Sequence, residues 1–223
     1  MKVVSRCMML LLALLLCSCS NDKESVIKYN AQVSKVLAMN KDVFKAAAAT
    51  MGANGDLTPE LREATELLTA FGTGVRDKDM YLRLSLLLGW QQANYISPFS
   101  KAIDKLKLEM TALSEIQKQI KNEEIKSKTG LLNEAILKYI KSNESLYFAQ
   151  TTPINNMMMY FLDLTKGKPI VENDVWRLNG DLKKYMDDTV TNVNEIIIDM
   201  KNIEPTSQNL KNTLSSKKYP SEF

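Results

Sequence analysis

Apolar residues recur at helical spacing through most of this 223-residue chain. Intervals of three and four residues place apolar side chains in a stripe along one face of a helix. The first stripe predicts a helix from about Glu24 to Met51. It consists of Val26, Tyr29, Val33, Val36, Val43 and Ala47. Asn40 interrupts this stripe, where a buried Asn could fix the register between helices or lie at the edge of the stripe.

The later helices are predicted from start and stop residues as well as from stripes. Ser or Thr followed by Pro supplies an N-cap and a proline suited to the first helical position. This pair occurs at Thr58, Ser97 and Thr152, each of which is predicted to start a helix. Gly130 and Pro205 are predicted to end helices. These rules predict helices over about 59–75, 77–95, 98–130, 132–150, 153–166 and 173–205.

Residues 80–90 are the one stretch where a strand competes with a helix. Leu82, Leu84, Leu86 and Leu88 alternate with less apolar residues, as they would in a strand. A helix is favoured because Leu, Met and Gln are good helix formers and because β-branched residues are absent before Ile96. No second strand-like run exists in the sequence to pair with its edge. We therefore expect a helix that is apolar nearly all round and is the most buried of the set.

The fold predicted from these elements is all-α. We expect a bundle-like single domain of about six helices over residues 25–205, followed by a polar C-terminal tail over 206–223. In that tail, Leu210 and Leu214 could support a turn of helix, but fraying is expected.

The first residues have the layout of an export signal. Lys2 and Arg6 precede any acidic residue, and Cys7–Leu16 is almost purely apolar. A membrane-spanning helix needs ~20 apolar residues to cross ~30 Å of hydrocarbon, so this run is too short to span. The chain then becomes polar at Ser20–Glu24.

The stretch Leu16-Cys17-Ser18-Cys19 closes the apolar run and resembles the lipobox of bacterial lipoproteins. The resemblance covers about the first twenty residues. It implies that residues 1–18 are a signal peptide, that a dedicated peptidase cuts between Ser18 and Cys19, and that Cys19 carries diacylglycerol and an added acyl chain such as palmitate. Two or three acyl chains would hold the protein on a membrane far more firmly than one.

Two alternatives accompany this interpretation. Cys17 is a competing lipidation site, but Leu16 before it is the wrong residue for cleavage, so Cys19 is favoured. The other alternative is an ordinary signal peptide cleaved nearby, which leaves Cys19 as a free thiol. Ser20 after the anchor resembles the pattern that sends lipoproteins to the outer membrane. We expect residues 19–24 to be a short lipidated tether and the domain to face the periplasm.

Composition excludes several function classes. The 29 Lys and Arg residues include Lys2 and Arg6, so the mature chain carries 27 basic against 26 acidic side chains. Near-neutrality argues against nucleic acid as a partner, because binding phosphates needs a concentrated basic face. No cysteine follows Cys19, so the mature domain cannot form an internal disulfide, even in an oxidising compartment.

No catalytic or metal site is predicted. The chain has no histidine, which removes the usual general base, and the usual zinc patterns are missing. Adjacent carboxylates at Glu123/Glu124 and at Asp187/Asp188 are interpreted as solvated helix faces. We therefore expect a protein that is not an enzyme and has no cofactor.

The segment Met157-Met158-Met159-Tyr160-Phe161 has the most unusual local composition. Three explanations are open: core packing, copper binding through thioethers, and an adaptable apolar surface for a partner. Three consecutive Met side chains point in three directions around a helix, which argues against one copper ion. Only two of the five side chains are expected to fit one inward stripe, so these five residues are the candidate partner surface.

The sequence thus favours a membrane-anchored envelope lipoprotein that acts through contacts with another envelope protein, as an accessory, structural or immunity-type component. In layout alone, the mature domain resembles the helical envelope lipoproteins of Gram-negative bacteria. The alternative is a helical lipoprotein that binds a small ligand or a lipid, for which an apolar pocket would be expected. A carboxylate-dependent hydrolase is the least favoured class.

Replacing Cys19 by Ala is expected to abolish lipidation and to leave the precursor uncleaved, because the lipoprotein peptidase acts after the cysteine is modified. Intact-mass measurement of the wild type and of Cys19→Ala, with Cys17→Ala as the matched control, tests this expectation. A wild-type N-terminus at Cys19 without acyl mass, or acyl mass on Cys17, would contradict it.

Overall fold

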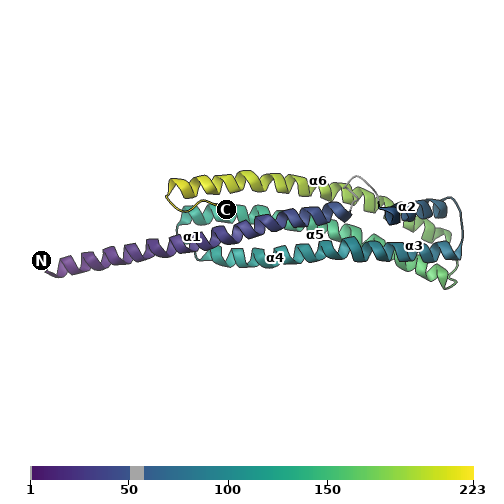
Figure 1. The fold of residues 1–223 in the computed structure, drawn as a ribbon, viewed down its shortest axis with the longest axis horizontal. Helices are drawn as coiled ribbons and strands as arrows, with labels where there is room; N and C mark the ends of the chain where they lie inside the picture. Colours follow the sequence, from purple (N-terminus) through teal and green to yellow (C-terminus); the bar gives the residue numbers. More distant parts are fainter. Residues whose placement is uncertain (1, 51–57) are drawn as a thin grey trace. The chain divides into compact units, whose positions relative to one another are not determined.

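The computed structural model describes the backbone of residues 2–50 and 58–223, and the side chains of residues 22–50 and 58–223 (Figure 1). Every regular element in those ranges is a helix, and they contain no strand, which confirms the all-α class. The side chain of Cys19 and the predicted loop at 52–56 lie outside the described residues. The elements are α1 (Lys2–Thr50), α2 (Pro59–Gly72), α3 (Lys78–Gln91), the π-helical turn η1 (Gln92–Ile96), α4 (Ser97–Lys118), α5 (Glu123–Thr165) and α6 (Glu172–Ser216).

The elements α3, η1 and α4 follow one another without a break, so the described chain forms five continuous helices instead of about six. The helix start predicted at Ser97 is therefore wrong. Ser97 has helical backbone angles, and its N–H donates to the carbonyl of Gln92 across the wide turn. Pro98 lacks the N–H that an α-helical bond would need, and the π-helical turn directly before it already interrupts the α-helical ladder.

The helix boundaries around Gly130 also differ from the prediction. α4 ends at Lys118, and α5 begins at Glu123, where the side chain of Asn122 accepts a hydrogen bond from the N–H of Ile125 at 3.1 Å. Asn is among the best N-cap residues, and this cap starts the helix well before Gly130. Gly130 lies inside α5, where an added Cβ would come within 3.1 Å of the Gln117 amide nitrogen. The glycine therefore allows a close approach and does not stop the helix.

Two prolines lie inside helices that they were predicted to start or end. Pro153 lies within α5 and Pro205 within α6. A proline in a helix interior costs about 3 kcal/mol, so tertiary packing must outweigh the local preference. In α6 the reason is visible beyond Pro205, because Leu210 and Leu214 are fully buried. The segment predicted as a frayed tail is therefore helical up to Ser216.

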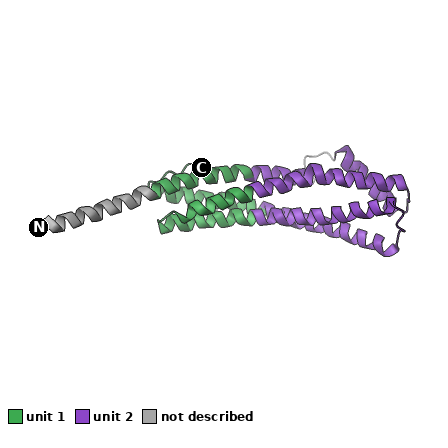
Figure 2. Ribbon diagram, turned by 90° about the horizontal axis from the view of Figure 1, so that it is seen from below, with its two compact units in different colours: residues 1–39, 106–139, 198–223 green, residues 40–105, 140–197 purple. Residues whose placement is uncertain are grey.

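The chain divides into two compact units, which are coloured separately in Figure 2. Unit 1 comprises Met1–Met39, Leu106–Tyr139 and Ile198–Phe223. Unit 2 comprises Asn40–Lys105 and Ile140–Ile197, and it contains α2, α3 and η1. Segments of α1, α4, α5 and α6 contribute to each unit.

Unit 1 is held by buried stripes from its four helical segments. The predicted α1 stripe is confirmed, since Val26, Tyr29, Val33 and Val36 are all buried. The Tyr29 hydroxyl donates to Oδ1 of Asn133 at 2.8 Å. Burial raises the pKa of the Tyr29 hydroxyl above its usual range, so this buried group stays neutral and acts as a donor.

Unit 2 has an aromatic core. Phe71 makes edge-to-face contacts with Tyr81, Tyr160 and Phe161, at centroid distances of 6.0, 6.3 and 5.2 Å. Such pairs add stabilisation beyond their buried area. The stretch predicted as a helix over 77–95 is helical. It is not buried on all sides, however, because Leu82 and Leu86 are exposed.

Gln150 is the least satisfied polar residue in the described part of unit 2. Its side chain is fully buried, and neither Oε1 nor Nε2 has a hydrogen-bonding partner among the described residues. Burying an amide without a partner costs about 1–3 kcal/mol.

Replacing Gln150 by Met, which is similar in shape and apolar, is therefore expected to raise the free energy of unfolding by about 1 kcal/mol. Gln150→Glu should instead lower it by several kcal/mol, because it buries a charge. Thermal unfolding followed by circular dichroism gives both values. A Gln150→Met variant less stable than the wild type would show that the amide makes favourable contacts in solution.

Candidate functional site

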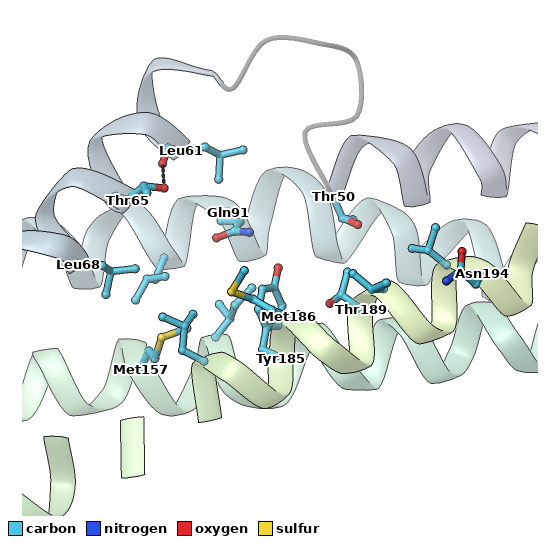
Figure 3. A pocket seen from close by; sticks show the side chains of 16 residues that line it. Thr50, Leu61, Thr65, Leu68, Gln91, Met157, Tyr185, Met186, Thr189 and Asn194 are labelled. Carbon is cyan, nitrogen blue, oxygen red and sulfur yellow. Dashed lines mark hydrogen bonds between the residues drawn. The ribbon is translucent and has the colours of Figure 1, made fainter. Parts of the chain in front are cut away.

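Unit 2 contains an apolar cleft of about 510 Å³ between α2, α3, α5 and α6, with Thr50 of α1 beside it (Figure 3). Its walls are mainly aliphatic and thioether side chains. The lining residues are Thr50, Leu61, Ala64, Thr65, Leu68, Leu88, Gln91, Ile154, Met157, Leu182, Tyr185, Met186, Thr189, Val190, Val193 and Asn194. All of them belong to unit 2.

Helix α2 is fixed at its start by the predicted Thr58–Pro59 pair. The Thr58 side chain accepts a hydrogen bond from the N–H of Leu61 at 3.3 Å, and Pro59 occupies the first turn. The helix then presents Leu61, Ala64 and Leu68 to the cleft, at the three- and four-residue spacing of one face. The short side chain of Ala64 leaves room that a larger residue would fill.

A surface ion pair joins α2 to α3 beside the cleft. The guanidinium of Arg83 donates to both carboxylate oxygens of Glu63 at 2.6 Å. Arg83 holds the pKa of the Glu63 carboxyl below its usual range. Because both side chains are exposed, solvent screens the pair and its contribution to stability is small.

The floor of the cleft is buried and its rim is open. Leu88, Ile154 and Met157 are each exposed by less than 5% and belong to the core of unit 2. On the rim, Met186 and Val190 of α6 are 60% and 62% exposed. Apolar side chains so exposed beside a cavity are typical of binding sites.

None of the described lining residues carries a charged side chain. The side chains of Gln91, Tyr185 and Asn194 make no hydrogen bond to another described residue, and the buried Thr189 hydroxyl also has no partner there. Burial raises the pKa of the Tyr185 hydroxyl above its usual range, which keeps it neutral. The cleft therefore offers apolar surface and a few neutral hydrogen-bonding groups, but no nucleophile activated by a base.

The Met157–Phe161 segment divides between core and surface. Met157, Tyr160 and Phe161 are buried, Met158 is partly buried, and Met159 is 50% exposed. Three side chains instead of the expected two therefore face inward, because Tyr160 and Phe161 both join the aromatic cluster around Phe71. Most of the candidate partner surface is thus core.

Met159 and Tyr160 also line a second cavity of about 420 Å³ in unit 2. This cavity is polar, since Asp163, Lys168 and Arg177 contribute to it. Burial raises the pKa of Tyr160, and the Lys168 ammonium lies 5.8 Å from its ring centroid. The exposed part of the methionine segment is therefore bordered by charges instead of continuing into an apolar surface.

The adjacent carboxylates do not converge on a site. Glu123 and Glu124 are exposed, and Glu124 forms an ion pair with Lys217 at 2.6 Å. Asp187 is exposed and Asp188 partly so.

Across residues 22–50 and 58–223, no group of three or more metal-ligating side chains occurs. Within the described residues, no helix has the length and apolarity needed to cross a membrane.

No family model matches the sequence, no curated protein matches it, and no solved structure matches the fold. The functional argument therefore rests on the residues of this chain and their geometry. Sequence patterns did not indicate the cleft, because its lining residues come from five helices and are spread from Thr50 to Asn194. The one local feature that relates to the cleft is the pair of short side chains Ala64 and Thr65, which lies between Leu61 and Leu68 in the sequence.

The two ends of the methionine run should respond differently to charge. Met157→Glu is expected to destabilise the protein by several kcal/mol, because it buries an unpaired carboxylate in the cleft floor. Met159→Glu should change the free energy of unfolding by no more than about 0.5 kcal/mol, because that side chain is half exposed. Melting curves of the two variants check this, and equal losses at both positions would contradict the burial described here.

Proposed function

We propose that this protein is a bacterial envelope lipoprotein, anchored to the outer membrane through Cys19, that binds a small apolar ligand and is not an enzyme. The anchor is supported by the sequence Leu16-Cys17-Ser18-Cys19 and by the basic and apolar residues before it. The helical units would then face the periplasm. Cys19 lies outside the residues whose side chains the structure describes, so the anchor rests on the sequence.

The ligand-binding part of the proposal rests on the cleft in unit 2. Small-molecule sites are concave, mostly apolar and about 300–1,000 Å³ in volume, with a few polar groups that orient the ligand. The cleft, at about 510 Å³, falls in that range, and its polar groups are neutral. This single observation favours ligand binding over the protein contact that the sequence favoured.

Contact with another envelope protein is retained as the second candidate, on a different surface. Val75, Ile170, Val171 and Trp176 of unit 2 are exposed by 36–69%. Ile170 and Trp176 also border a hollow of about 400 Å³ beside Arg76. Trp and Arg are enriched at protein interfaces. Among the described residues, no arrangement of carboxylates supports the hydrolase alternative.

Two threonines on α2 allow a matched test of the cleft. Thr65 and Thr69 are both exposed, and each hydroxyl donates to the carbonyl four residues earlier, at 2.9 and 2.8 Å. Only Thr65 lines the cleft. A large side chain at Thr65 would occupy the space of a ligand, whereas the same change at Thr69 would not.

Thr65→Trp is therefore expected to weaken binding of N-phenyl-1-naphthylamine, an uncharged apolar fluorophore, at least tenfold, and Thr69→Trp should leave it unchanged. Fluorescence titration of the mature chain from residue 19, with Cys19→Ser to keep it free of lipid, measures the dissociation constants. Both variants should melt close to the wild type. No fluorophore binding by the wild type, or equal binding by the three proteins, would overturn the ligand-binding proposal.

A further inference from the structure

The polar and apolar side chains of the cleft are not evenly distributed. Leu61, Leu68 and Met157 lie toward one end of the cleft together with Thr65, and Thr189 and Asn194 lie toward the other (Figure 3). Val190 and Val193, which also line the cleft, are neighbours of Thr189 and Asn194 on α6. Along α6 the lining runs from Leu182 to Asn194. Twelve residues of α-helix correspond to about 18 Å, so the site is elongated. A ligand that fills it would meet mainly aliphatic and thioether side chains at one end, and the Thr189 hydroxyl and the Asn194 amide beside two valines at the other.

The polar end is uncharged and has hydrogen-bonding capacity to spare. The Thr189 hydroxyl is buried and has no partner among the described residues. The Asn194 side chain is exposed, and its amide makes no hydrogen bond to another described residue. A buried hydroxyl without a partner costs free energy that a ligand could recover by hydrogen bonding. Because none of the described lining side chains is charged, an ionised head placed against the buried Thr189 hydroxyl would lose hydration without gaining a counter-charge.

We infer that the cleft takes an elongated, uncharged amphiphile, with its aliphatic tail at the Leu61–Leu68–Met157 end and a neutral polar head at the Thr189–Asn194 end. Alcohols, esters and amides have such heads, whereas fatty-acid anions and alkylammonium ions do not. This inference rests on the proposed function and adds the chemical class of the ligand and its direction in the site.

Matched control residues for the polar end lie on the same helix. Thr191 and Asn192 are neighbours of the two head-contacting residues but do not line the cleft. The Thr191 hydroxyl donates to the carbonyl of Asp187, and the Asn192 amide donates to that of Asp188. Substitution there makes the same chemical change outside the site.

The experiment is displacement of N-phenyl-1-naphthylamine by 1-decanol and by decanoate at pH 8, which share one chain length and differ in head charge. The protein is again the mature chain with Cys19→Ser, which retains both units. The wild type is expected to bind decanol at least tenfold more tightly than decanoate. Asn194→Lys should reduce that ratio to about twofold or less, because it places a cation at the head, while Asn192→Lys should leave the ratio unchanged.

Thr189→Val, which keeps the side-chain shape, should weaken decanol binding about fivefold without changing fluorophore binding, whereas Thr191→Val should change neither. Equal binding of decanol and decanoate by the wild type would overturn the inference and leave the proposed function standing. An Asn194→Lys variant with the wild-type ratio, or a Thr189→Val variant with wild-type decanol affinity, would do the same. Failure of every probe to bind would overturn the proposed function and this inference with it.

Discussion

The apolar stripe of each helix must be covered by the stripes of other helices, and this constraint shapes both units. No cysteine follows Cys19, so no disulfide can supplement packing among residues 20–223. Burial contributes about 25 cal/mol for each Å² of apolar surface, which makes a run of buried side chains stronger than any local preference. Leu210 and Leu214 illustrate this, since their burial accompanies helix in a segment of otherwise polar composition.

The same constraint explains which elements the sequence could predict. An apolar stripe arises because one face of a helix is buried. The stripe from Val26 to Ala47 therefore identified the buried residues of α1 correctly. Start and stop residues act only within one turn, and their effect is small beside packing on both sides of them. Thr58–Pro59 starts a helix with the Thr58 side chain as its cap, whereas Thr152–Pro153 lies in a segment with buried residues on each side, Gln150 and Ile154 among them. The identical dipeptide therefore has opposite outcomes.

Sequence patterns do not predict the cleft. A stripe indicates which side chains face inward, but not whether facing stripes meet or leave space between them. Here Ala64 on α2 and Leu182 on α6 line the same cleft, and no local pattern in the sequence distinguishes this alanine from one outside the cleft. The methionine segment shows the converse, because its composition suggested a surface and its buried aromatic neighbours made most of it core.

The π-helical turn between α3 and α4 has a consequence for chain length. Eight residues separate Leu88 from Ile96, which in a regular α-helix would rotate the second side chain by about 80° beyond two full turns. Both side chains are nevertheless buried, at 2% and 0% exposure, because the wide turn at Gln92–Ile96 absorbs the additional residue. Deleting one residue within this turn would restore a regular helix and keep both faces inward. A deletion in the α-helical stretch on either side would instead rotate a buried stripe toward solvent, so single-residue length variation is tolerable at the π-helical turn and damaging beside it.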